Sequence, residues 1–145
     1  MEIKVIVAKQ HEKQLENETA ARIIKTVEEQ LNANKIEYQE NTINYIYLDG
    51  LYQHKNRSML TAGVFLNALD KKVTAIKGTL RLKYKNESAS IAKAMIDFDN
   101  EYMGELNPGE ALYFEINIPV KGLSEDKEFK IVDIEGTFED VIVHY

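Results

Sequence analysis

The spacing of apolar residues changes once along the chain, and this change separates a short N-terminal part from a longer C-terminal part. Ile3–Ala8 is a short apolar run typical of a strand. From about residue 11 to residue 34 the apolar positions recur three and four residues apart, which predicts an amphipathic helix that ends near Asn32 or Asn34. Its apolar positions are Leu15, Ala20, Ile23, Ile24, Val27 and Leu31. We expect this stripe to pack on a sheet, with a partner helix as the alternative.

From about Tyr45 onward, apolar and polar residues alternate, as they do in strands that bury one face. The predicted strands cover residues 45–52, 59–67, 73–85, 91–98, 111–119, 129–134 and 137–143. Turn signals recur at nearly the spacing expected of a sandwich, and no β-α-β alternation follows residue 45. The sequence therefore predicts an α+β fold, with an N-terminal β-strand and α-helix in residues 1–44 and an antiparallel β-sandwich of about seven strands in residues 45–145.

The clearest turn lies at Asn107-Pro108-Gly109-Glu110, where proline and glycine fit the two central positions of a type II turn. The strand after it is expected to end at Pro119, because proline cannot donate to a strand ladder. Another turn is predicted at Glu135-Gly136. Residues expected to face the core from the strands on either side of the first turn are Ala92, Ala94, Ile96, Phe98, Leu112, Phe114, Ile116 and Ile118. Those expected to face outward are Tyr113, Glu115 and Asn117.

Composition narrows the choice of partners and chemistry. The 145 residues carry a net charge of -6, which argues against a nucleic-acid partner. The absence of cysteine excludes disulfides, thiol nucleophiles and cysteine-bound zinc. No apolar run approaches membrane-spanning length, and the N-terminus lacks the apolar region of a signal peptide. We therefore expect either a cytoplasmic protein or a chain that begins after a signal or an anchor.

Residues that could support catalysis are scattered. His11, His54 and His144 show no metal-ligand spacing, and isolated surface histidines are the simpler interpretation. The segment Asp97–Tyr102 resembles the start of a calcium loop, but the glycine and glutamate that the loop needs are missing. No serine lies in a nucleophile motif, and no glycine-rich loop could hold a phosphate. The sequence thus predicts no enzyme activity, no catalytic residue, no metal and no cofactor.

Two groups of side chains are candidates for binding. Lys77, Arg81, Lys83 and Lys85 form a basic stripe on one strand face, which could meet an anionic polymer or simply be the solvated face of an outer strand. Tyr45 and Tyr47 share a face, and Tyr113 is expected to point outward. Such tyrosines could stack on sugar or anchor a protein interface, although packing under the N-terminal helix is the favoured interpretation. The predicted binding residues are Tyr45, Tyr47, Arg81, Lys83, Lys85 and Tyr113.

A longer pattern spans residues 58–119. It contains Val64, Phe65, Asn67, Leu80, Leu82, Ala94, Phe98, Leu106, Pro108, Gly109, Glu110 and Phe114. In this order it resembles the small immunoglobulin-like modules of Gram-positive bacteria, of the FxLYD and SLAP types. The resemblance implies an immunoglobulin-like sandwich and a non-catalytic module, often of an envelope or secreted protein. It supplies no catalytic residues.

The sequence therefore leads us to expect a non-enzymatic binding or interaction module, with a Gram-positive cell envelope or secreted protein favoured. Its partner would be a protein or a cell-envelope polymer. The alternative is a structural subunit, intracellular or phage-derived, that forms a homodimer or larger oligomer through its N-terminal helix.

Overall fold

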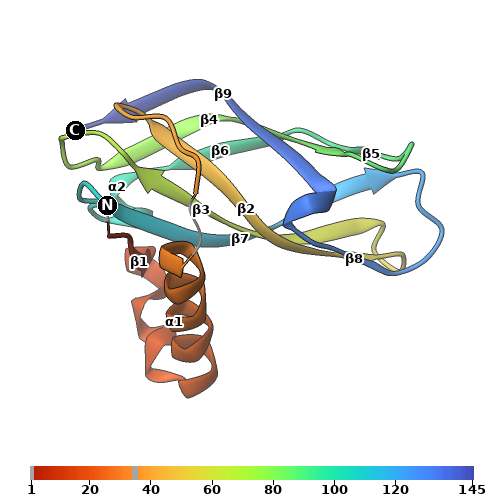
Figure 1. Ribbon diagram of the computed structural model, residues 1–145, viewed down its shortest axis with the longest axis horizontal. Helices are drawn as coiled ribbons and strands as arrows, with labels where there is room; N and C mark the ends of the chain where they lie inside the picture. Colours follow the sequence, from red (N-terminus) through yellow and green to blue (C-terminus); the bar gives the residue numbers. More distant parts are fainter. Residues whose placement is uncertain (1, 34–35) are drawn as a thin grey trace.

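The computed structural model describes residues 2–33 and 36–145 and shows a mostly β protein of two sheets, with a helical segment on one side of the larger sheet (Figure 1). The N-terminal segment contains β1 (Lys4–Val7), the 3-10 helix η1 (Lys9–Glu16) and α1 (Glu18–Ala33). Two further short helices are α2 (Asn100–Met103) and η2 (Ile131–Asp133).

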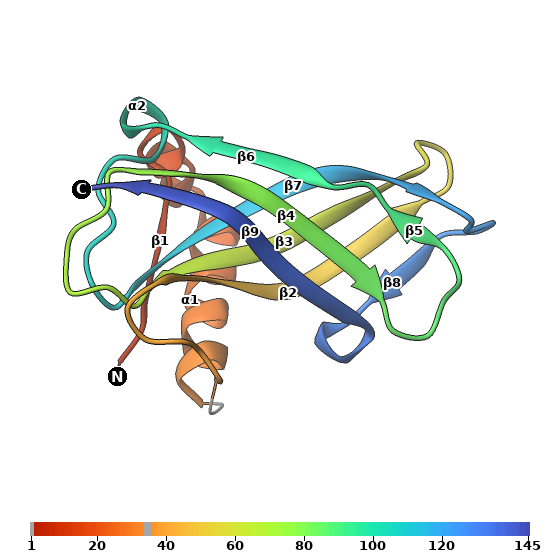
Figure 2. The same cartoon turned by 90° about the horizontal axis from the view of Figure 1, so that it is seen from above.

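The larger sheet has the strand order β1-β7-β3-β2-β8, and β5 pairs with the far end of β7. Its remaining strands are β2 (Ile43–Gln53), β3 (Ser58–Asn67), β5 (Ser90–Ile91), β7 (Glu110–Lys121) and β8 (Lys127–Phe129). The smaller sheet has the order β6-β4-β9, with β4 (Ala75–Tyr84), β6 (Ala94–Phe98) and β9 (Ile134–His144). Figure 2 shows this sheet lying over the larger one. Strand β1 runs parallel to β7, whereas the other described pairs are antiparallel.

The main core lies between the two sheets, which confirms a sandwich. Phe65 and Phe114 of the larger sheet stack with 4.7 Å between ring centroids. Phe98 and Phe138 of the smaller sheet each contact Phe65, at 5.9 and 4.7 Å. Such aromatic contacts fill large volumes in defined orientations, so they hold the two sheets in one arrangement.

A second apolar cluster covers the outer face of the larger sheet. Val27 and Leu31 of α1 are buried there with Val64, Leu66 and Ala111. The expectation that the helix packs on a sheet is therefore confirmed for its C-terminal half.

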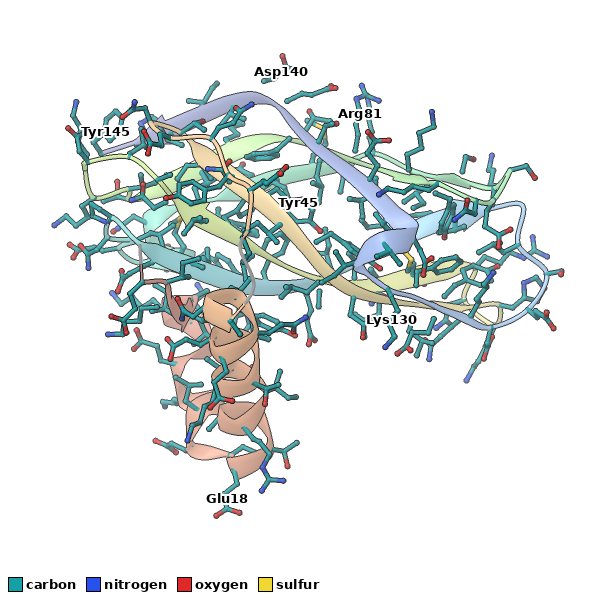
Figure 3. The ribbon with its side chains drawn as sticks, viewed as in Figure 1. Glu18, Tyr45, Arg81, Lys130, Asp140 and Tyr145 are labelled. Atoms are coloured by element: carbon teal, nitrogen blue, oxygen red, sulfur yellow. The ribbon has the colours of Figure 1, made fainter. Side chains whose placement is uncertain are left out.

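The N-terminal half of the helical segment is far less covered. Leu15 and Ile23 are 38% and 45% exposed, although both belong to the predicted apolar stripe. Figure 1 shows the segment projecting from the sheet, and Glu18 lies at its outer tip in Figure 3. Only the base of the projection is held by apolar packing.

The predicted continuous helix is divided at Asn17. Its side-chain Oδ1 accepts hydrogen bonds from the backbone N–H groups of Thr19 and Ala20, at 2.9 and 3.2 Å. These bonds satisfy donors at the start of α1, so Asn17 is an N-cap and the residues before it form a separate 3-10 helix. Asn34, one of the two predicted stop residues, lies outside the described residues.

Two strand predictions around β7 are wrong. The predicted strand 91–98 is two strands, β5 and β6, which pair in different sheets, and Ala92 at the break is exposed rather than buried. Strand β7 also continues through Pro119 to Lys121. The missing N–H of Pro119 faces the side of β5, where the proline carbonyl still accepts a bond from Ala92 N at 2.9 Å. Pro119 directs neither its nitrogen nor its carbonyl toward β3, so the hydrogen bonds between β7 and β3 are unaffected and the strand continues.

The predicted turn at Glu135-Gly136 is also wrong, because both residues lie within β9. The chain instead turns at η2, where the backbone N–H of Lys130 donates to Asp133 Oδ2 at 2.8 Å. Gly136 is needed for close packing: a Cβ there would lie 3.0 Å from Leu82 and 3.1 Å from the Tyr45 ring.

Candidate functional site

A β-bulge in β2 places a carboxylate on an otherwise apolar face. Tyr47 pairs with Gly63 of β3, but the next pair joins Asp49 to Ala62, so Leu48 is an extra residue. A bulge disturbs the strict alternation of side chains. Leu48 and Asp49 consequently both belong to the outer face of the larger sheet, although they are neighbours in the sequence.

The strand register then brings a second carboxylate into the same row. Ala62 pairs with Asp49 on one side and with Glu115 of β7 on the other. Two strand spacings separate the two acidic residues, about 10 Å between backbones. The small side chain between them leaves the row hollow at its centre.

Two cavities lie along this row and meet beneath α1. The inner cavity, of 370 Å³, lies over Ala62 and is also lined by Asp49, Leu51, Leu60 and Glu115. The outer cavity, of 230 Å³, lies between the helical segment and β7; its lining includes Leu15 and Tyr102. Both cavities share three lining residues, which are Ile23, Tyr113 and Glu115. We call the two together the α1 groove.

The groove is apolar with acidic charge. In residues 2–33 and 36–145, its charged lining groups are the carboxylates of Asp49 and Glu115, and no lysine or arginine lines either cavity. Leu51 and Leu60 are 42% and 39% exposed in its wall. A ligand that fits must therefore offer apolar surface together with positive charge.

Asp49 is poorly compensated in this position. Its Oδ1 atom is buried and has no hydrogen-bond partner among the described residues. Burial raises the pKa of the Asp49 carboxyl, while a hydrogen bond from the Gly50 backbone and the charge of Lys130 act in the opposite direction. Lys130 itself pairs with Glu128 at 2.8 Å. A carboxylate oxygen that is dry and unpartnered gains strongly from a cationic donor.

Tyr113 fixes the other end of the row. Its hydroxyl donates to Glu115 Oε1 at 2.8 Å. Burial raises the pKa of Tyr113, and the hydrogen bond and charge of Glu115 and the charge of Asp49 raise it further. The phenol therefore stays protonated and holds the Glu115 carboxylate in place. Of the predicted binding residues, Tyr113 is the one that lies in this groove.

Tyr45 and Tyr47 lie on the opposite face of the sheet, so the favoured expectation that they pack under the helix is wrong. Both rings belong to the core between the sheets, and Tyr45 is seen there in Figure 3. The Tyr47 hydroxyl donates to the Phe129 carbonyl at 2.7 Å. The Tyr45 hydroxyl is buried and has no hydrogen-bond partner in residues 2–33 and 36–145, and burial raises its pKa.

The basic stripe lies on the outer face of the smaller sheet, far from Tyr113. Its strand, β4, is central between β6 and β9, so these residues do not protect a sheet edge. Arg81, labelled in Figure 3, pairs with Glu139 at 2.8 Å. Lys83 lies opposite Glu135 in the register, and Lys77 lies opposite Asp97. Lys85 lies just beyond β4. The acidic neighbours across the sheet offset most of the positive charge.

The remaining sequence candidates serve local structure. His54 contacts the Tyr52 hydroxyl at 2.9 Å, and His11 contacts Gln14 at 3.1 Å. Asp99 caps α2 by accepting a hydrogen bond from Tyr102 N. Within the described ranges no group of three or more histidine, aspartate or glutamate residues is placed to hold a metal ion.

Sequence reasoning missed Asp49 and the partnership of Asp49 with Glu115. The signal for Asp49 was weak: a polar residue followed by Gly50 interrupts an otherwise regular strand, which is typical of a bulge. No local pattern could pair it with Glu115, because β7 is separated in the sequence from the hairpin of β2 and β3 by β4, β5 and β6.

Among the helices of the described residues, none combines the length and apolarity needed to cross a membrane. No protein-family model matches this chain, and no curated protein or solved structure matches it.

Proposed function

We propose that this protein is a non-enzymatic interaction module that binds a polypeptide segment of a partner protein in the α1 groove. The single observation that carries the proposal is the row of Asp49, Ala62 and Glu115 beneath a half-covered helix. Its two carboxylates flank a hollow with exposed leucines in the wall. The segment that complements it carries an arginine or lysine next to apolar residues.

Charge is what selects this partner over other occupants. An anionic polymer would meet two carboxylates, and no lysine or arginine of the described part of the chain lines either cavity. A guanidinium placed over Ala62 could instead pair with the carboxylates of Asp49 and Glu115. Hydrogen bonds between ionised groups are the stronger kind, and they are strengthened further where water is excluded.

The finer identity of the module is part of the same proposal. We propose an immunoglobulin-like sandwich. In its support, the consecutive strands β3 and β4 lie in different sheets: β3 pairs with β2 and β7, whereas β4 pairs with β6 and β9. A Gram-positive cell envelope or secreted setting rests on the sequence resemblance alone. A signal peptide or lipobox encoded upstream in the gene would support that setting.

The proposal is tested with a fluorescent seven-residue peptide that has a central arginine flanked on each side by threonine, then valine, then serine. Fluorescence polarisation should show saturable binding. A twin with glutamate in place of arginine should bind at least about tenfold more weakly, as should the arginine peptide to the double variant Asp49→Asn, Glu115→Gln. The exposed loop variant Asp70→Asn serves as the control and should bind as the parent protein does. No binding of the arginine peptide at millimolar concentration would overturn the proposal.

A second candidate is a structural subunit that oligomerises through its N-terminal helix. The exposed stripe residues Leu15 and Ile23 favour it. Light scattering should then show a mass that rises with concentration, and Ile23→Glu should return the chain to a monomer. A monomeric mass throughout the micromolar range would reject this candidate and leave the groove as the binding site for another protein.

A further inference from the structure

We infer that the partner segment binds as an added strand on the edge of β7, in the gap between β1 and β5. This inference rests on the proposed function and specifies how the segment is held. Exposed strand edges bind extended peptides because their free backbone groups continue the ladder.

The gap is visible in the register of β7. Strand β1 pairs with β7 as far as Tyr113, and β5 pairs with it from Val120 onward. Between these points, residues 114–118 pair with β3 on one side. On the other side no described strand pairs with them. The gap accepts a segment of about three to five residues, the length of a short strand.

The backbone groups that face the gap follow from two observed hydrogen bonds. The carbonyls of Gly109 and Pro119 accept bonds from Lys4 N and Ala92 N, so both point toward the side of β1 and β5. Alternate residues of a strand direct their N–H and C=O groups to the same side. Glu115 and Asn117 therefore direct theirs into the gap.

The outer edge of the neighbouring strand β1 is closed to an added strand, because side chains of α1 already bind its backbone N–H groups. The outward N–H groups of Ile3, just before β1, and of Val5 within it donate to side chains of α1, Asn32 Oδ1 and Glu28 Oε1, both at 2.8 Å. This cover ends where β1 ends. Val7 instead lines the outer cavity of the α1 groove together with Glu115. The open edge and the groove are thus one continuous space.

The side chains of an added strand would reach both parts of this space. A guest residue beside Glu115 lies in the row that continues to Ala62 and Asp49. An arginine there extends beneath Ile23 toward the two carboxylates. Guest residues on either side of the arginine turn to the opposite face, toward the half-buried Ile116. Apolar residues two positions from the arginine return to the outer face, beside Leu15 in the outer cavity.

The test uses the arginine peptide and two twins that differ only in backbone N-methylation. One twin is methylated at alternate residues and the other at the remaining residues, so each removes the donors of one strand edge. One twin should lose at least about tenfold in affinity, whereas the other should bind within about twofold of the parent peptide.

A protein variant gives an independent measurement. Asn117→Pro removes an N–H that faces the gap, as Pro119 already does two residues later, so the melting temperature should change little. Its affinity for the arginine peptide should fall. Ile116→Pro is the matched contrast, because it removes a donor on the side of β3 and should unfold the sheet.

If both twins bind as the parent does, or both lose affinity equally, the added strand is rejected while the arginine-dependent groove remains. Folded Asn117→Pro with unchanged affinity rejects it as well. If the arginine and glutamate peptides bind alike, the proposed function itself fails, and the two failures are therefore distinguishable.

Discussion

At the scale of single residues, one extra residue in β2 creates the feature on which the proposed site depends. Without the bulge, Leu48 would pair with Ala62 and Asp49 would alternate to the core side, where a carboxylate could not be accommodated. The bulge instead places Asp49 beside Ala62 with one oxygen unpartnered. The folded chain thus contains a carboxylate oxygen that has no hydrogen-bond partner among the described residues. Unpartnered buried polar groups are uncommon in folded proteins and often mark functional positions.

Asp49→Asn should therefore change how stability depends on pH. Because burial raises the pKa of Asp49 in the folded state above its ordinary value, the ionised carboxylate lowers the free energy of unfolding. This penalty is absent below the unfolded-state pKa and develops as pH rises through the folded-state pKa. Urea unfolding should show the variant matching the parent near about pH 3 and exceeding it near about pH 7. A difference that is constant with pH would contradict the prediction.

Tyr45 and Gly63 illustrate a second residue-scale constraint. A Cβ on Gly63 would lie 2.7 Å from Tyr45 Cε1, and the ring is held by Phe65 and Phe114. Gly63→Ala should therefore lower the free energy of unfolding by about 1–3 kcal/mol. In a Tyr45→Ala background the same substitution should cost much less, which a double-mutant cycle by urea unfolding measures. Equal costs in both backgrounds would show that the ring is not the obstacle.

At the scale of elements, α1 has two halves with different roles. Its C-terminal half closes the sheet through buried Val27 and Leu31 and through side-chain bonds to β1. Its N-terminal half stands over the α1 groove and leaves Ile23 45% exposed. The sequence shows one continuous apolar stripe, which we expected to pack on a sheet. In the structure, the C-terminal part of the stripe packs on the sheet, whereas its N-terminal part extends beyond the sheet and stays exposed.

Two leucines of the helical segment, Leu31 in α1 and Leu15 in η1, provide a test of the contrast between its packed and its exposed part. Leu31 is 4% exposed, whereas Leu15 is 38% exposed. Leu31→Ala should lower the free energy of unfolding by about 2–4 kcal/mol, because it leaves a cavity against the sheet. Leu15→Ala should cost less than about 1 kcal/mol. Thermal unfolding followed by circular dichroism would compare them, and similar costs would contradict the division.

At the scale of the whole molecule, the parts that sequence could predict are those determined by neighbours in the chain. The turn at Asn107–Glu110 is confirmed: Gly109 has a φ of 83°, and Glu110 N donates to the Asn107 carbonyl at 3.0 Å. The alternation in β3 and the burial of Leu80 and Leu82 follow from the two-residue period.

The parts that could not be predicted depend on pairing between distant strands. The row from Asp49 to Glu115 requires β2, β3 and β7 in one register. Pro119 remains within β7 only because its side without an N–H faces the short strand β5. The sequence predicts a turn at Gly136, because the reason for a glycine within β9 is not visible locally. The Tyr45 ring that packs against it lies ninety-one positions earlier in the chain.

Removal of the N-terminal segment tests whether residues 45–145 form an independent domain, as the sequence predicts. Val64, Leu66 and Ala111 are fully buried in the cluster that β1 and α1 cover. A chain starting at Asn44 would expose them, so we expect its melting temperature to fall by more than about 10 °C. Differential scanning calorimetry of both chains measures the change. An unchanged transition would show that the sandwich is stable by itself.

The parallel pairing of β1 with β7 has a consequence for synthesis. Lys4 pairs with Glu110, so β1 is completed by a strand that is synthesised more than a hundred residues later. At translation rates of about 5–20 residues per second, β1 and the apolar base of α1 wait roughly 5–20 s for their partner. During that interval the nascent chain displays surfaces that the finished protein buries. This interval exposes the nascent chain to aggregation, and slowing translation ahead of β7 would lengthen it.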